Sequence, residues 1–116
     1  MLVVDDDARV RDALHQLIDA AGGMEVVATA DDVSRALEAD LRFNPEVALV
    51  DVLLPDRADG VEVVRTLALR GRPVVATSVS AAVRDDALAA GAFNFVEKGP
   101  ERQPLLSALR DSAERP

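Results

Sequence analysis

The sequence contains no cysteine, tryptophan or tyrosine, and its three phenylalanines are its only aromatic side chains. Without cysteine the chain has neither a disulfide framework nor a thiolate metal site, so it needs no oxidising compartment. It also lacks an apolar run long enough for a membrane span or a signal peptide, because residues 1–4 are followed at once by acids. We therefore expect a cytoplasmic protein without a membrane segment.

Positive charge is scarce as well. The net charge is −8 at pH 7, which argues against direct binding of nucleic acid because phosphate backbones require a basic face. An acidic chain is better suited to a cation site or a basic protein partner. Lys98 is the single lysine among thirteen basic side chains. The length of 116 residues predicts one domain over 1–116, with 112–116 as a tail or the start of a linker.

Short apolar runs alternate with stretches of helical periodicity along the whole chain. Asp7 is placed to cap the first helix, Gly60 to begin the third, and Pro104 to lie in the first turn of the fifth. The fourth helix, at 80–90, has few large apolar residues and is expected to be the least stable. The strands are predicted at 2–4, 24–28, 47–50, 73–78 and 92–97.

This alternation predicts the fold class. Crossovers of this length join parallel strands through right-handed connections. The expected product is an α/β protein, a three-layer doubly wound (βα)5 sandwich of the flavodoxin-like type. Its five-stranded parallel sheet is expected in the order 2-1-3-4-5.

Polar residues stand where the predicted strands end, and in such a sheet these ends converge on one edge. They are Asp5 and Asp6, Asp51, Ser78 and Lys98. Three crowded carboxylates repel one another, and a hard divalent cation such as Mg²⁺ relieves this while leaving room for a phosphate oxygen. A hydroxyl and an ammonium could hold the other phosphoryl oxygens. The set therefore indicates a site for phosphoryl transfer, with Asp51 as a candidate nucleophile or metal ligand.

These residues resemble those of a known family, the receiver domains of two-component response regulators, over essentially the whole chain. Residues 4–7 are similar to the acidic pair of the family, and Asp51 with Pro55 is similar to its phosphoacceptor motif. Ser78 aligns with the family's Ser/Thr, Phe95 with its switch aromatic, and Lys98 with its lysine.

The resemblance implies a switch. Asp51 would accept a phosphoryl group from a histidine kinase, a phosphotransfer protein or a small phosphodonor. Asp6 and Asp51, with the backbone carbonyl of Leu53, would hold Mg²⁺, and Asp5 would help through water. Phosphorylation would draw Ser78 inward and let Phe95 follow, which shifts the surface formed by the fourth helix, fifth strand and fifth helix.

The resemblance also allows two assemblies. One is a homodimer through that same surface. The other is a helix-turn-helix output domain outside this chain, which Gly99 favours because it replaces the proline that often follows the lysine.

Other positions depart from the family pattern. Asp51 and Gly60 are nine residues apart where eight is usual, so the intervening loop is one residue longer. Val79 replaces a smaller residue and is expected to narrow access to Asp51. Phe95 replaces the more usual tyrosine, which removes a hydroxyl but keeps the ring.

Two alternatives remain open from the sequence. A haloacid-dehalogenase-type phosphatase also uses a strand-end aspartate and Mg²⁺, and residues 5–7 would supply its Asp-x-Asp motif. Such enzymes normally need a longer chain and a cap. The second alternative is a degenerate receiver that acts only as a protein-binding or dimerisation module, which a failure to form a phosphoaspartate would favour.

Overall fold

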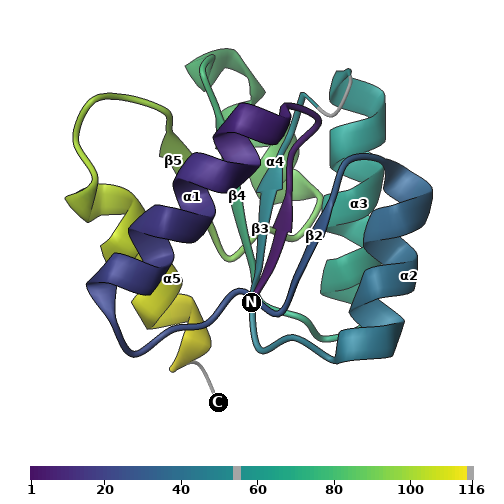
Figure 1. The fold of residues 1–116 in the computed structure, drawn as a ribbon. Helices are drawn as coiled ribbons and strands as arrows, with labels where there is room; N and C mark the ends of the chain where they lie inside the picture. Colours follow the sequence, from purple (N-terminus) through teal and green to yellow (C-terminus); the bar gives the residue numbers. More distant parts are fainter. Residues whose placement is uncertain (54–55, 115–116) are drawn as a thin grey trace.

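A computed structural model describes residues 1–53 and 56–114. Its five strands are all parallel and lie in the order β2-β1-β3-β4-β5, so the predicted fold class and strand order are confirmed (Figure 1). Along the chain the elements are β1 (Leu2–Val4), α1 (Ala8–Ala21), β2 (Ala28–Ala30), α2 (Val33–Phe43), β3 (Ala48–Asp51), α3 (Arg57–Leu69), β4 (Val74–Ser78), the 3-10 helix η1 (Ala81–Val83), α4 (Arg84–Ala89), β5 (Asn94–Glu97) and α5 (Gln103–Ala113).

Helices cover both faces of the sheet and divide the core in two. Helices α1 and α5 lie on one face, and α2 and α3 lie on the other (Figure 1). The α1/α5 face buries Val3, Ile18, Leu49 and Leu109 among others, and the opposite face buries side chains from β1, β3, β4, α2, α3 and α4. Strands β1 and β3 are buried throughout, as expected for central strands of a parallel sheet.

The prediction for the second strand was wrong by several residues. Strand β2 occupies Ala28–Ala30 rather than 24–28. Its register explains this, because Leu2 pairs with Ala28 and Val4 pairs with Ala30, and β1 offers only three residues to pair with. The apolar pattern of 24–28 could not reveal where this ladder begins.

The third helix begins earlier than predicted. Asp56 caps α3 by accepting a hydrogen bond from the backbone N–H of Asp59, so Gly60 lies inside the helix and does not begin it. Gly60 serves a different purpose. A Cβ added to it would lie 1.6 Å from the backbone oxygen of Val52, so only glycine lets the helix approach the end of β3 this closely.

The last two helices also differ from expectation. The segment predicted as one helix at 80–90 is divided into η1, capped by Ser80, and the six-residue α4. Helix α5 continues through Ala113, and Ser112 is fully buried with its hydroxyl donating to the carbonyl of Ala108. The prediction of a tail at 112–116 was therefore wrong for residues 112–113. Residues 115–116 lie outside the described residues. No helix within 1–53 and 56–114 is long and apolar enough to cross a membrane.

Candidate functional site

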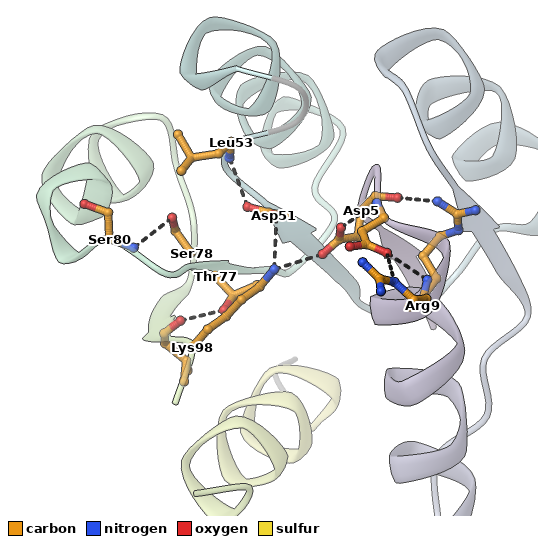
Figure 2. Close-up of polar contacts among 11 residues, drawn as sticks. Asp5, Arg9, Asp51, Leu53, Thr77, Ser78, Ser80 and Lys98 are labelled. Atoms are coloured by element: carbon orange, nitrogen blue, oxygen red, sulfur yellow. Dashed lines mark hydrogen bonds and ion pairs between the residues drawn. The ribbon is translucent and has the colours of Figure 1, made fainter. Parts of the chain in front are cut away.

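The parallel topology brings the strand-end residues to one edge of the sheet. Asp5 directly follows β1, Asp51 ends β3, Ser78 ends β4, and Lys98 directly follows β5. Asp51 pairs with Thr77 across β3 and β4, and the N–H of Lys98 donates to the carbonyl of Ser78 at 2.8 Å. The register therefore aligns the ends of these strands, and Figure 2 shows Asp5, Asp51, Ser78 and Lys98 at this edge of the sheet.

Lys98 joins two of the carboxylates. Its Nζ lies 3.0 Å from Asp5 Oδ2 and 3.0 Å from Asp51 Oδ2, although the three residues are far apart in sequence (Figure 2). Burial disfavours the charged form of Lys98, but the hydrogen bonds and charges of Asp5 and Asp51 outweigh this, so the pKa of the ammonium is raised above its ordinary value. The folded state then holds this proton more tightly. The resulting stabilisation is complete below the ordinary lysine pKa and is lost as the pH rises through the folded pKa.

The three acids of the site differ in their surroundings. Asp5 is buried, and its second carboxylate oxygen accepts from the N–H of Asp7 at 3.0 Å. Asp51 is also buried, and its Oδ1 accepts from the N–H of Leu53 at 3.0 Å. Asp6 is exposed, and its side chain forms no hydrogen bond or ion pair with the part of the chain that the structure describes. One oxygen of each carboxylate lies within 4.8 Å of the others, so the group could hold a metal ion.

The hydroxyls at the end of β4 have different partners. Thr77 donates to the carbonyl of Val96 at 2.7 Å, which ties it to β5. Ser78 is fully buried, and its Oγ accepts a hydrogen bond from the N–H of Ser80 at 3.2 Å (Figure 2). Phe95 is buried in the core on the α2/α3 face. Val79 is 71% exposed, and its expected effect on access to Asp51 stays a prediction.

Two sequence predictions about the loop after Asp51 have different outcomes. Leu53 lies at the site through its N–H, as its hydrogen bond to Asp51 shows. The use of its carbonyl as a metal ligand stays a prediction. Pro55, the second residue of the phosphoacceptor motif, lies outside the described residues.

Arg11 also contacts the site, although no sequence pattern had singled it out. Its Nη1 donates to the backbone carbonyl of Asp5 at 2.7 Å. A signal was present, because Arg9 and Arg11 stand at the start of α1, where the helix dipole disfavours cations and the first turn contains no acid. Such a local conflict often marks a side chain with a tertiary role.

The fold and this site together define a class of protein. It consists of α/β domains with one parallel sheet, in which a lysine bridges carboxylates at the carboxyl ends of the strands. The sequence model of the family described as response regulator receiver domain matches residues 1–110. The chain belongs to this family. It is thus a regulatory domain of two-component signalling, and the phosphatase alternative is not favoured.

Curated proteins that are similar to this chain are named protein-glutamate methylesterase/protein-glutamine glutaminase. Protein-glutamate methylesterase/protein-glutamine glutaminase 2 of Xanthomonas campestris pv. campestris is 42% identical over 97% of this chain, and a protein of the same name, numbered 6, from Anaeromyxobacter dehalogenans is 38% identical over 99%. The chain spans about a third of the length of these curated relatives (33%).

Solved structures of receiver domains match the fold. The response regulator domain of Thermotoga maritima CheB has a TM-score of 0.85 and 29% identity, with 99% of this chain and 96% of that chain covered. The receiver domain of NtrX from Brucella abortus has a TM-score of 0.86 and 27% identity, with 99% and 98% covered.

Proposed function

We propose that this chain is a phosphorylation-activated switch that accepts a phosphoryl group on Asp51, with Mg²⁺, from a histidine kinase, a phosphotransfer protein or a small phosphodonor. The observation that carries the proposal is the position of Lys98, whose ammonium lies 3.0 Å from both Asp5 and Asp51. A fixed cation beside a buried carboxylate is suited to the oxygens of an incoming phosphoryl group.

The donor set fits Mg²⁺, which prefers oxygen ligands and binds through one or two carboxylates with several waters. Asp5 and Asp51 each accept two hydrogen bonds, whereas the side chain of Asp6 accepts none within the described residues, so both oxygens of Asp6 are available to a metal ion. Following the resemblance to the receiver family, we assign Asp6 and Asp51 with the Leu53 carbonyl as direct ligands and Asp5 as a ligand through water. The bound ion would neutralise charge on the phosphoryl oxygens during transfer.

Asp51 is the proposed nucleophile. Its carboxylate is oriented by the N–H of Leu53 and the ammonium of Lys98, one on each oxygen. An oxygen lone pair attacks phosphorus, and the bond from phosphorus to the donor breaks. With a phosphohistidine donor this is a P–N bond, and a proton on the other ring nitrogen of that histidine lets it leave as neutral imidazole, so that an acyl phosphate remains on Asp51. Lys98 can then pair with a phosphoryl oxygen.

Ser78 and Phe95 are the proposed elements of the switch. The oxygen of the Ser78 hydroxyl accepts the N–H of Ser80 at 3.2 Å, and its O–H donates to none of the described residues, so the O–H is available to donate to a phosphoryl oxygen. Movement of Ser78 toward the phosphoryl group would change the end of β4 and the start of η1. Phe95 pairs with Ala76 across β4 and β5, so its packing is coupled to the same strand.

Phosphorylation of the parent protein is expected to add one phosphoryl group, and Asp51→Asn is expected to abolish this because an amide cannot form the acyl phosphate. The measurement is intact mass after incubation with acetyl phosphate and Mg²⁺. Asp59→Ala is the matched control, since Asp56 caps α3 and its loss would disturb the fold. Labelling that survives Asp51→Asn would refute the assignment. An unlabelled parent would favour the degenerate receiver.

Asp6→Asn is expected to weaken Mg²⁺ binding by at least tenfold, because it removes a charged ligand. The free energy of unfolding of the metal-free protein should change by less than about 1 kcal/mol, because Asp6 is exposed. The change should be a small increase, because the substitution reduces repulsion among the three carboxylates. Isothermal titration and urea unfolding with and without Mg²⁺ measure both effects. If Mg²⁺ raised the free energy of unfolding of the parent and of Asp6→Asn by the same amount, Asp6 would not be a ligand.

We also propose partners for this chain. The matched methylesterase names suggest a catalytic output as an alternative to the helix-turn-helix domain that Gly99 favours. A homodimer that forms through α4, β5 and α5 also stays a proposal. The same holds for a cytoplasmic location. Light scattering before and after phosphorylation tests the dimer.

A further inference from the structure

Arg11 has no role in the function proposed above, yet its contact is specific. It is half-buried at the start of α1, and its Nη1 donates to the backbone carbonyl of Asp5 at 2.7 Å. Neighbouring Arg9 is different. Its side chain is 94% exposed, and its guanidinium lies 3.7 Å from the carboxylate of Asp7.

The carbonyl that Arg11 holds belongs to the peptide bond between Asp5 and Asp6. Because a peptide group is planar, fixing its oxygen also fixes the plane from which the Cα of Asp6 extends. The side chain of Asp5 is already restrained by Lys98 and the N–H of Asp7. The side chain of Asp6 has no such restraint from the described residues, so its place relative to Asp51 depends on the backbone.

The charge and the hydrogen bond of Arg11 have opposite consequences for a cation at the acidic cluster. A guanidinium near the site repels a divalent cation and would weaken its binding. The hydrogen bond to the Asp5 carbonyl instead restrains the backbone that carries a ligand.

We propose that Arg11 is a positioning residue for the cation site, which sets the place of Asp6 through the carbonyl of Asp5. Loss of Arg11 then weakens Mg²⁺ binding even though it removes a positive charge. This inference rests on the proposed Mg²⁺ site and adds a residue to it.

The test compares two arginines of the same helix. Arg11→Met is expected to raise the Kd for Mg²⁺ about tenfold, measured by isothermal titration at fixed pH and ionic strength. Arg9→Met removes the same charge without touching the Asp5 carbonyl, and its Kd should be unchanged or slightly lower. Arg11→Lys retains a donor and a charge, and should recover part of the loss. If Arg11→Met is too unstable to titrate, Arg11→Lys carries the test, with an expected Kd between those of the parent and Asp6→Asn.

A double variant separates positioning from general destabilisation. In the Asp6→Asn background the ligand that Arg11 positions is gone, so adding Arg11→Met should change the Kd by less than about twofold. A full tenfold loss in that background, or an unchanged or lower Kd for Arg11→Met alone, would overturn the inference. If the parent binds Mg²⁺ and Arg11→Met binds it equally well, only the role of Arg11 is refuted. If the parent binds no Mg²⁺, the proposed cation site is refuted as well.

Discussion

Gly60→Ala is expected to lower the free energy of unfolding by about 2–4 kcal/mol. The added Cβ would lie 1.6 Å from the backbone oxygen of Val52 and 2.6 Å from its Cα. Alanine is a better helix former than glycine by about 1 kcal/mol, so helix propensity alone predicts the opposite sign. The steric clash dominates because a backbone carbonyl cannot turn away as a flexible side chain can.

The effect of Gly60→Ala should extend to the proposed phosphorylation site at Asp51. Val52 directly follows Asp51, and its N–H donates to the carbonyl of Thr77 at 3.0 Å. A displaced Val52 therefore strains the junction of β3 and β4, where the carboxylate of Asp51 is held. We expect Gly60→Ala to slow phosphorylation by acetyl phosphate even at temperatures where the variant is folded.

Gly99→Ala is the matched control for stability, because a Cβ at Gly99 would meet no atom within 4 Å. Its free energy of unfolding should stay within about 0.5 kcal/mol of the parent value. Urea unfolding of the three proteins makes the comparison. A Gly60→Ala protein as stable as the parent would mean that α3 can move away from β3 at little cost.

Arg72→Met is expected to lower the free energy of unfolding by about 2–4 kcal/mol, because it leaves a buried carboxylate with one partner fewer. Asp40, in α2, is fully buried and lies 2.7 Å from Arg72 Nε and 3.0 Å from Arg70 Nη1. Arg72 also donates to the carbonyl of Pro45 at 2.6 Å. The cluster thus connects α2, the segment after α3 and the segment that leads into β3.

Arg35→Met is the control, because it breaks an ion pair of similar length at the surface. Arg35 lies 2.8 Å from Asp31, and the two side chains are 68% and 39% exposed. Water and salt screen such an exposed pair, so its loss should lower the free energy of unfolding far less than the loss of Arg72. Urea unfolding measures both variants. If Arg35→Met and Arg72→Met lowered the free energy of unfolding equally, the burial of Asp40 would not explain the expected effect of Arg72→Met.

The sequence predicted the fold because the relevant signals are local. Apolar runs bounded by acids, glycines and prolines indicated five strands, although the second was placed several residues too early, and their alternation with helices predicted a parallel sheet. Once the sheet is parallel, residues that end different strands must share an edge. This is why Asp5, Asp51, Ser78 and Lys98 could be grouped before their contacts were known.

The tertiary structure alone decided which contacts those residues make and what supports them. Lys98 bridges Asp5 and Asp51 because the register of β1, β3 and β5 aligns their ends, and no periodicity encodes that register. Gly60 was taken for a helix start because its true constraint, the carbonyl of Val52, comes from the residue that follows β3. Asp40 and Arg11 were missed for the same reason. Their partners are chosen by packing between elements, whereas sequence patterns report only the conformation within each one.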